Sequence, residues 1–384
     1  MKRVNNIYDK ICDLDNIMDM AHKVCLNTRN KKKVDRFETF YSEEIIYIKK
    51  MLENRSYVCG KYNIFLIKEP KVRLIMSESI RDKIVNHLVS KYFLVDVFDS
   101  SFIESNIATR EGKGTHYGLS LIKRYLNEIK RDNKEIYYLK VDIKKYFYNI
   151  DHVILKRIIR TKVKDRDALS LIDYIIDSTD EEYINKEIIK VKDKEINRIK
   201  LSNLSEKDKR IKIEEIESIP LCKRGKSCSI GNMSSQIFGI LYLSELDHFI
   251  KEELHIKYHL RYMDDIILIH NNKEYLKYCL GEIIKVLNKY KLEVNSKKTC
   301  IKSIKSGLDV LGFRFYIKNN KTIVKVRNST KLRFMKKCKY LNLMRELNMI
   351  DGKYYTNALA GYYGHLSWGN CSKLFYRNIF FAIN

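Results

Sequence analysis

Two adjacent aspartates, Asp264 and Asp265, lie between two short apolar runs and constrain the fold more than any other feature of the chain. Residues 259–262 and 266–269 meet at Met263–Asp264, which predicts a β-hairpin whose tip presents acidic side chains. Neighbouring carboxylates repel each other, and a buried pair cannot stay ionised without a counter-charge. A divalent cation supplies that charge, and oxygen-only ligands suit Mg²⁺ or Mn²⁺. The alternative, for such a pair taken alone, is a solvated loop.

A third carboxylate, Asp142, ends the alternating run from Ile136 to Val141, which is typical of a strand. The chain should turn into a helix there, so Asp142 projects from a strand end. Together with the Asp264–Asp265 hairpin it gives three carboxylates that can hold two metal ions about 3.5–4 Å apart for an in-line displacement. Taken in isolation, Asp142 would be a helix N-cap. The hairpin favours the metal site.

The excess of basic residues indicates a polyanionic partner. The chain holds 74 Lys and Arg against 48 Asp and Glu, a net charge of +26 over 384 residues, and neutralising phosphates releases counterions that drive association. A Lys-rich, AT-biased proteome is the alternative source of this charge. No apolar run has membrane-spanning length and the N-terminus lacks a signal-peptide core, so we expect a cytoplasmic protein with no membrane partner. The nine cysteines are scattered and form no zinc-site spacing.

The apolar periodicity predicts a mixture of helices and short strands. Residues 181–226 are dominated by Lys, Glu, Asp and Asn, which favours a solvated helical hairpin or mobile loop over a dedicated binding element. We expect Trp368 to pack the final helices together, with the minor groove of a duplex as the alternative contact. The predicted helices cover residues 1–55, 79–93, 117–131, 234–254 and 275–290 and the last sixty residues; the predicted strands lie within 60–75, 136–141, 259–269 and 306–327.

The acidic segments, with residues 230–236 (Ile-Gly-Asn-Met-Ser-Ser-Gln) between them, resemble the palm of a reverse transcriptase, and the resemblance runs in order from about Tyr57 to Asn370. It implies an α+β right-hand polymerase fold with fingers, a palm of antiparallel sheet backed by helices, and a short helical thumb. The boundaries it implies are a basic helical extension at 1–55, fingers with part of the palm at 56–135, palm at 136–318 with a charged insertion at about 183–226, and thumb at 319–384.

The resemblance also implies roles for single residues. Asp142, Asp264 and Asp265 fall on the metal-binding aspartates, with Ile143 beside them, and imply two Mg²⁺ ions, with Mn²⁺ as the alternative. Lys298 resembles the lysine near the pyrophosphate, which we include among the catalytic residues; the alternative is an ordinary surface lysine.

Further segments resemble the nucleotide and template sites. Lys71 and Arg73 resemble the basic fingers residues that hold the triphosphate, and Gln236 the residue beside the sugar. Phe147 falls on the aromatic gate that excludes a ribose 2′-hydroxyl, although an aromatic after a strand is also common in a core. The template and primer residues implied in this way are Arg110, Lys113, Gly114, Leu311, Gly312 and Phe313.

We therefore expect an RNA-directed DNA polymerase that makes cDNA from a cognate non-coding RNA, with template RNA, RNA/DNA hybrid and deoxynucleotides as partners. The segment from Gly231 to Gln236 resembles diversity-generating-retroelement enzymes, whereas Cys228–Ser229 resembles divergent bacterial enzymes of antiphage defence, the role we favour. Template-independent or protein-primed DNA synthesis and a catalytically silent RNA-binding module stay open as alternatives. An accessory protein and a homo-oligomer stay open as well.

Overall fold

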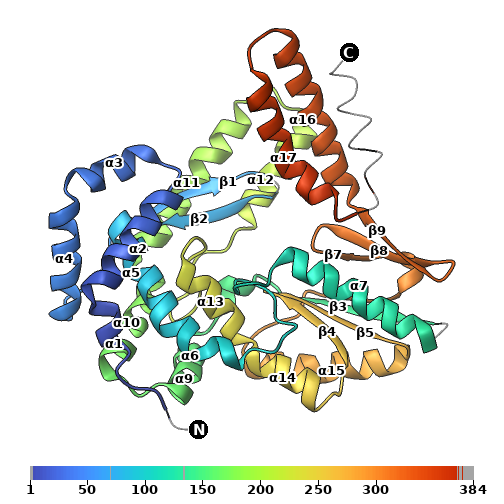
Figure 1. Cartoon of the computed structure of the whole chain (residues 1–384), viewed down its shortest axis with the longest axis horizontal. Helices are drawn as coiled ribbons and strands as arrows, with labels where there is room; N and C mark the ends of the chain where they lie inside the picture. The colour runs from blue at the N-terminus through green and yellow to red at the C-terminus, as the bar shows by residue number, and fades with distance from the viewer. Residues whose placement is uncertain (1–2, 70, 133–134, 370, 372–373, 375–384) are drawn as a thin grey trace. The chain divides into compact units, whose positions relative to one another are not determined.

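The computed structural model describes residues 3–69, 71–132, 135–369, 371 and 374, and the chain divides into two compact units. Unit 1 comprises Met1–Ile103, Ile143–Asp247 and Lys285–Glu293. Unit 2 comprises Glu104–Asp142, His248–Ile284 and Val294–Asn384. Each unit is therefore assembled from segments that are far apart in the sequence (Figure 1). Asn370, the end of the sequence resemblance, and residues 375–384 of the expected thumb lie outside the described residues.

Unit 1 is mainly helical. Its helix starts carry acidic or polar caps: Asp13 accepts a hydrogen bond from the Asn16 backbone N–H, and Asp165 accepts one from Ala168, which satisfies amides that a helix start leaves unpaired. Its helices are α1 (Tyr8–Cys12), α2 (Leu14–Asn27), α3 (Lys31–Thr39), α4 (Tyr41–Glu53), α5 (Ile80–Val89), α6 (Asp96–Phe98), α8 (Tyr146–Asn149), α9 (His152–Lys162), α10 (Arg166–Asp177), α11 (Glu182–Lys200), α12 (Glu206–Glu217) and α13 (Met233–Tyr242).

Two predicted helices differ from expectation in detail. The helix expected over 79–93 is α-helical only to Val89 and continues as a π-helical segment, Ser90–Val95. The helix expected over 234–254 is two helices, because the backbone at Leu243 leaves the helical region between α13 and α14 (Ser244–Glu252). Helices α14 and α15 (Lys273–Lys289) contribute residues to both units.

The charged segment of unit 1 is a helical hairpin, α11 and α12, and it covers an antiparallel pair of strands. These are β1 (Asn63–Ile67) and β2 (Arg73–Ser77). The Lys68 ammonium also lies 2.6 Å from the Glu195 carboxylate of α11. One buried apolar cluster joins the two layers and consists of Tyr62, Ile64, Leu74, Met76, Ile184, Ile188, Ile219 and Cys222.

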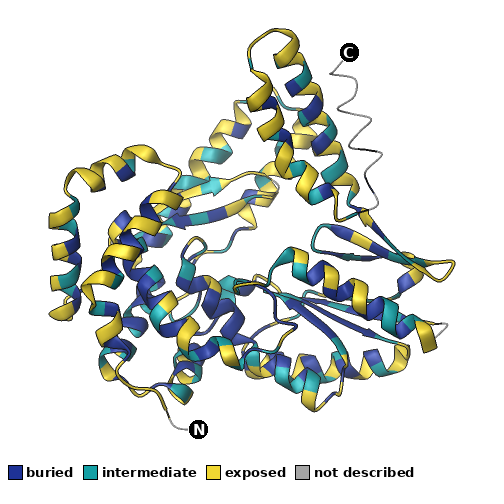
Figure 2. Ribbon diagram, in the orientation of Figure 1, coloured by how far each residue is buried: buried dark blue, intermediate teal, exposed yellow. Residues whose placement is uncertain are grey.

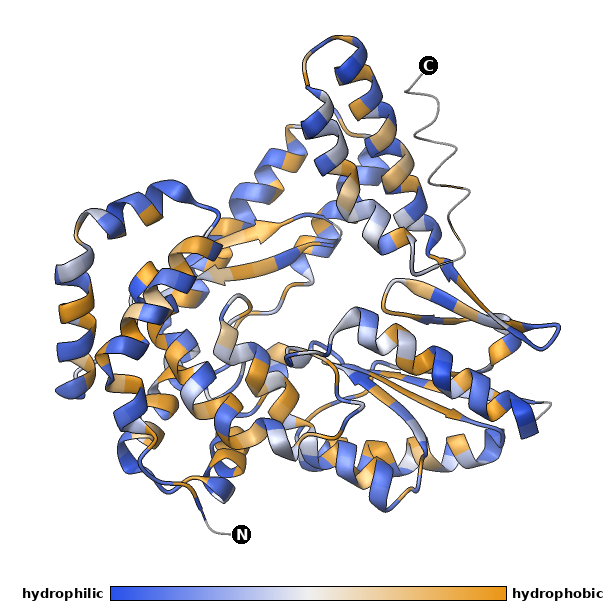
Figure 3. Ribbon diagram, in the orientation of Figure 1, coloured by the Kyte–Doolittle hydropathy of each residue, from blue (hydrophilic) through white to orange (hydrophobic). Residues whose placement is uncertain are grey.

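Unit 2 is built on a four-stranded antiparallel sheet with the order β4-β5-β3-β6. Strand β5 is buried on both faces (Figure 2), as its unbroken apolar run requires, and is hydrophobic through its middle (Figure 3). Ile267 and Ile269 pack with residues of helix α7 (Thr115–Asp132) on one face, and Ile266 and Leu268 are buried on the other. The strands are β3 (Tyr137–Asp142), β4 (Tyr258–Tyr262), β5 (Asp265–His270) and β6 (Cys300–Ser303).

A second sheet and two helices complete unit 2. Strands β7 (Leu308–Val310), β8 (Phe313–Lys318) and β9 (Lys321–Val326) form an antiparallel meander, followed by α16 (Asn328–Glu346) and α17 (Gly352–Leu366). Phe313, Phe315 and Phe334 are fully buried in the same cluster as the α7 face of the first sheet. The mixed helical and antiparallel architecture confirms the predicted α+β fold class. Of the helices described, none is long and apolar enough to cross a membrane.

Candidate active site

The acidic hairpin tip has the predicted position. Strand β4 ends at Tyr262 and β5 begins at Asp265, so Met263 and Asp264 form the turn. Met263 has a left-handed backbone with φ of 54°, as a tight hairpin turn requires. The side chain of Arg261 is fully buried, and its guanidinium donates a 3.1 Å hydrogen bond to the Met263 carbonyl oxygen. This contact holds the turn, and with it Asp264, in one conformation.

Asp142 lies at the end of the neighbouring strand, directly opposite Asp265 in the β3–β5 register. The Asp142 side chain is buried and has two partners from the loop before β6. The Asn295 amide donates to Asp142 Oδ1 at 2.8 Å, and the Lys298 ammonium lies 3.1 Å from both carboxylate oxygens. The Asn295 backbone N–H also donates to the Asp142 carbonyl oxygen at 2.8 Å. The loop therefore fixes both the backbone and the carboxylate of Asp142.

The three carboxylates crowd negative charge around Asp264. Burial, followed by the charge of Asp265 and then that of Asp142, raises the pKa of Asp264 from 3.8 to about 6. Asp265 has a counter-charge of its own, because the Lys140 ammonium on β3 lies 3.3 Å from its Oδ1. Asp264 is thus the least compensated member of the set, and a positive charge beside it would restore its usual acidity.

In unit 1, the Phe147 ring packs against helix α13, which also carries Gln236. Phe147 lies in α8, and its ring contacts Gly239 of α13 so closely that an added Cβ would be 3.2 Å from the ring. The Tyr146 hydroxyl donates to the Gly239 carbonyl oxygen at 2.6 Å and holds α8 on α13. Gln236 is exposed and precedes Gly239 by three positions, so the two residues lie on the same side of α13. The half-buried ring of Phe147 is accordingly not a closed core residue.

Arg73 begins β2 and Lys71 precedes the strand by two positions, and both side chains are exposed. The same strand touches the segment before α13, because the Met76 backbone N–H donates to the Ile230 carbonyl oxygen at 2.9 Å. Gly231 allows this approach: its φ is 142°, and a Cβ there would lie 2.6 Å from the Met76 carbonyl oxygen. Strand β2 and helix α13 are thereby tied together within unit 1.

The residues predicted to contact template and primer lie in unit 2. Arg110, Lys113 and Gly114 form the approach to α7, where the Gly114 carbonyl oxygen accepts from the Gly118 N–H. Leu311 and Gly312 form the β7–β8 turn with φ of 50° and 88°, which is the geometry of a two-residue hairpin loop. The Phe313 side chain, by contrast, is fully buried, so only its backbone is available to a nucleic acid.

Comparison with known proteins identifies the family. The family described as "Reverse transcriptase (RNA-dependent DNA polymerase)" matches residues 66–315, well over half of the chain. The chain belongs to the reverse transcriptase family. It is an RNA-directed DNA polymerase, a nucleotidyltransferase whose substrates are an RNA template and deoxynucleotides. No curated protein matches it.

Reverse transcriptases use divalent metal ions, and the donor set of unit 2 suits them. Three carboxylates and no imidazole or thiolate are what a hard cation such as Mg²⁺ prefers. The Ile143 side chain is buried, so this residue can offer only its carbonyl oxygen. Among the described residues, one group of three metal-ligating side chains has all its ligand atoms within 4.8 Å of one another, and it does not include these aspartates. The Asp142 carboxylate is held by Lys298 instead, and the ammonium provides the positive charge at this position.

The structure adds residues to this reverse transcriptase site that the sequence did not single out. Asn295 contacts Asp142 directly and Lys140 contacts Asp265 directly, and no motif in the sequence marks the first of these contacts. The prediction that Trp368 packs the final helices together is wrong. Its side chain is 41% exposed, and it stacks on His116 with ring centroids 4.7 Å apart.

Proposed function

We propose that this reverse transcriptase makes cDNA from a cognate non-coding RNA by two-metal-ion nucleotidyl transfer, with Asp142, Asp264 and Asp265 as ligands and Mg²⁺ as the usual ion. The observation that carries the proposal is the alignment of Asp142 with Asp265 across β3 and β5, beside a turn that presents Asp264. The raised pKa of Asp264 supports it, because burial and the neighbouring carboxylates make ionisation of that carboxylate costly and a positive partner would offset the cost.

The residues around Asp142 then have distinct tasks. The ions, when bound, would increase the acidity of the primer 3′-hydroxyl and neutralise charge on the leaving pyrophosphate. Asn295 orients the Asp142 carboxylate through its 2.8 Å hydrogen bond, and the carbonyl of Ile143 would be an additional oxygen ligand. Lys298, released from Asp142, donates a proton or a charge-assisted hydrogen bond to the pyrophosphate. Mn²⁺ satisfies the same oxygen donors and is the alternative ion.

The proposed deoxynucleotide-binding surface consists of Phe147, Gln236, Arg73 and Lys71. The exposed Arg73 guanidinium and Lys71 ammonium suit triphosphate oxygens. The Phe147 ring is backed by Gly239, and in the proposed role it would exclude a 2′-hydroxyl. Phe147→Ala is expected to raise ribonucleotide incorporation about 10- to 100-fold relative to deoxynucleotide incorporation, measured by single-nucleotide extension. Unchanged sugar discrimination would contradict the gate.

The proposed contacts to template and primer are Arg110, Lys113, Gly114 and the β7–β8 turn at Leu311–Gly312, with Phe313 as its buried anchor. The N-terminus of α7 and the basic residues before it favour phosphate. We place the domain boundaries as the resemblance implies them: basic extension 1–55, fingers 56–135, palm 136–318 with the insertion at about 183–226, and thumb 319–384.

The biological role that we favour is antiphage defence in the cytoplasm. Diversification of a target gene, protein-primed or template-independent synthesis, and silent RNA binding are the alternatives. Sequencing the nucleic acid that co-purifies with the protein separates them, because a defined RNA joined to cDNA identifies template, primer and product together. DNA covalently attached to a tyrosine would instead indicate protein priming.

The two-metal assignment is tested with the double variant Asp264→Asn, Asp265→Asn. Primer extension on a homopolymeric RNA should fall at least 1,000-fold, because an amide cannot supply the negative charge the ions need, whereas the affinity for RNA should change less than twofold. Asp167→Asn is the matched control, since Asp167 forms an exposed ion pair with Arg55 in unit 1 and touches none of the site residues. Extension that survives the double change rules out the assignment.

A further inference from the structure

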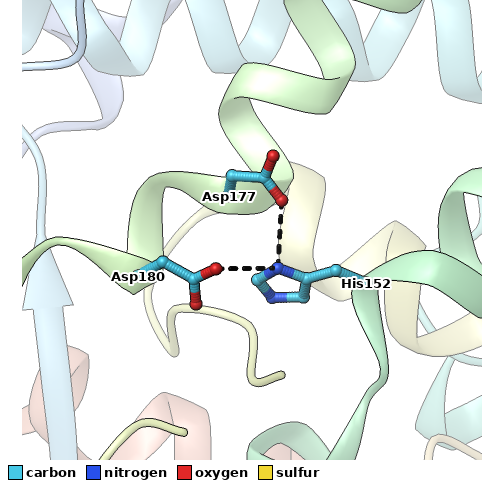
Figure 4. A group of neighbouring side chains, drawn as sticks. All are labelled: His152, Asp177 and Asp180. Atoms are coloured by element: carbon cyan, nitrogen blue, oxygen red, sulfur yellow. Dashed lines mark hydrogen bonds and ion pairs between the residues drawn. The ribbon is translucent and has the colours of Figure 1, made fainter. Parts of the chain in front are cut away.

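A histidine and two aspartates converge within unit 1, and none of the three belongs to the set of Asp142, Asp264 and Asp265. His152 begins α9, Asp177 ends α10, and Asp180 follows in the next turn (Figure 4). His152 Nδ1 lies 3.1 Å from Asp177 Oδ1 and 3.7 Å from Asp180 Oδ2. In the part of the chain that is described, this is the one group of three metal-ligating side chains whose ligand atoms all lie within 4.8 Å of one another.

A hydrogen bond on the far side of the ring determines which nitrogen faces the carboxylates. His152 Nε2 is 2.7 Å from the Ser227 carbonyl oxygen, and a carbonyl only accepts, so Nε2 carries the proton. In a neutral imidazole the lone pair is then on Nδ1 and faces two anionic oxygens. The ring is 2% exposed, so water does not relieve the repulsion. A cation between Nδ1 and the two carboxylates relieves this repulsion. It is either a second proton on the ring or a metal ion.

The two separations from His152 Nδ1 fit a tetrahedral metal ion. Bonds of about 2.0–2.2 Å from Zn²⁺ to nitrogen and oxygen place tetrahedral ligand atoms about 3.3–3.5 Å apart. The observed separations of 3.1 and 3.7 Å bracket this range. The Asp177 side chain is 46% exposed, which leaves a solvent side for the ion to enter and for a water to complete the coordination.

Both carboxylates are also held from outside. The Lys156 ammonium contacts the other oxygen of Asp177, Oδ2, and leaves Oδ1 directed at the imidazole. The Gly225 backbone N–H donates to the Asp180 carboxylate at 3.0 Å. The Ser227 carbonyl oxygen does the same for the His152 ring. Each of the three side chains therefore has a second contact of the kind that orients ligands at metal sites.

We propose that His152, Asp177 and Asp180 bind one divalent transition-metal ion, Zn²⁺ above all, as a structural site separate from the polymerase ions. An imidazole ligand disfavours Mg²⁺ and favours the later transition metals.

The ion would stabilise the segment that leads into α13. Ser227 has a left-handed backbone with φ of 84°, its N–H donates to the Ile150 carbonyl oxygen, and the next N–H, of Cys228, donates to the Phe147 carbonyl oxygen at 2.8 Å. The site thereby anchors the backbone of Phe147. This effect on nucleotide selection rests on the proposed role of Phe147, whereas the metal binding itself does not.

The test measures zinc content and thermal unfolding of the full chain, in saturating Mg²⁺ throughout. Untagged wild-type protein should retain about one zinc per chain after dialysis, and its Tm should be about 5–10 °C higher in zinc at a hundredfold excess over Kd than in a zinc-selective chelator. Asp177→Asn and Asp180→Asn should lose both effects. Asp173→Asn is the matched control on α10, since Asp173 pairs with Arg160 outside the cluster, and it should behave as wild type.

Cobalt substitution separates this site from a cysteine site. Bound Co²⁺ should absorb in the visible range without the near-ultraviolet band of a thiolate ligand, because burial raises the pKa of the nearby Cys222 and Cys228 and keeps them as thiols. Zinc retained equally by the Asp180→Asn variant, a thiolate band, or a wild-type Tm that responds to pH but not to zinc would overturn the proposal. The last result would mean that a proton occupies the position. Loss of nucleotide selection in a variant whose zinc content is normal would show that the role of Phe147 does not depend on the metal ion.

Discussion

The unfavourable charge on Asp264 predicts a variant that is more stable than the wild type and yet inactive. The pKa of Asp264 is raised from 3.8 to about 6, first by burial and then by Asp265. A shift of about two units corresponds to about 3 kcal/mol. Because Asp264 is half-buried and solvent screens part of the repulsion, we expect Asp264→Asn to stabilise the metal-free protein by about 1–2 kcal/mol at pH 7.5.

The sign of the pH dependence follows from linkage. The folded-state pKa lies above the unfolded value, so ionisation favours the unfolded chain. The penalty is fully present above pH 6 and absent below about pH 4, and the difference between variant and wild type should be about half as large at pH 5 as at pH 7.5.

The assay is thermal unfolding in a metal chelator at these two pH values. For a unit of this size, 1–2 kcal/mol corresponds to a rise in Tm of about 2–8 °C for Asp264→Asn. Asp265→Asn is the comparison variant: it also removes a charge that acts on Asp264, but it breaks the 3.3 Å ion pair with Lys140, so its rise in Tm should be smaller. A Tm at or below wild type for Asp264→Asn, or an equal rise for Asp265→Asn, would refute the reasoning. Saturating divalent metal should reverse the order, since it stabilises only the ionised site.

Two further predictions concern a lysine and a glycine. Lys298→Ala removes the ammonium that competes with a metal ion for Asp142. The metal concentration for half-maximal incorporation should therefore fall about 2- to 5-fold, while the maximal rate decreases. A higher metal requirement in a titration would show that Lys298 assists metal binding. Gly231→Ala should cost about 2 kcal/mol or more of stability in chemical denaturation, because its Cβ meets the Met76 carbonyl oxygen at φ of 142°. Gly281→Ala, in a helix with open space around it, should stabilise by up to about 1 kcal/mol, and equal effects of the two changes would contradict the steric argument.

The acidic turn was predictable because its causes are local. Two apolar runs that bracket Met263–Asp264 allow one hairpin register, and a strand that ends at Asp142 presents its last side chain at the sheet edge. The reverse transcriptase family and the α+β fold follow from such segments in order. Periodicity also gave several of the helices to within a few residues, but it missed the separation of α13 and α14 at Leu243, and α9 and α10 were not predicted.

Contacts between distant segments were not predictable in the same way. Asn295 and Lys298 reach Asp142 from more than 150 positions along the chain, and one sequence carries no signal for that pairing. The stacking of Trp368 on His116 depends on tertiary structure that apolar patterning does not encode. The cluster at His152 was not predicted, because its aspartates are spaced like ordinary helix-end residues. It also contains no cysteine, so cysteine spacing gives no sign of it.

The cover that α11 gives to β1 and β2 has a consequence for the nascent chain. The apolar partners of Leu74 include Ile184, which leaves the ribosome about 110 residues later. At about 5–20 residues per second this is a delay of about 5–20 s. A lone two-stranded hairpin is at best marginally stable in water, so its apolar face stays exposed during that interval. Shortening the charged segment would leave this hairpin without its core, and slow codons before residue 184 would prolong the time in which a chaperone or another nascent chain can bind it.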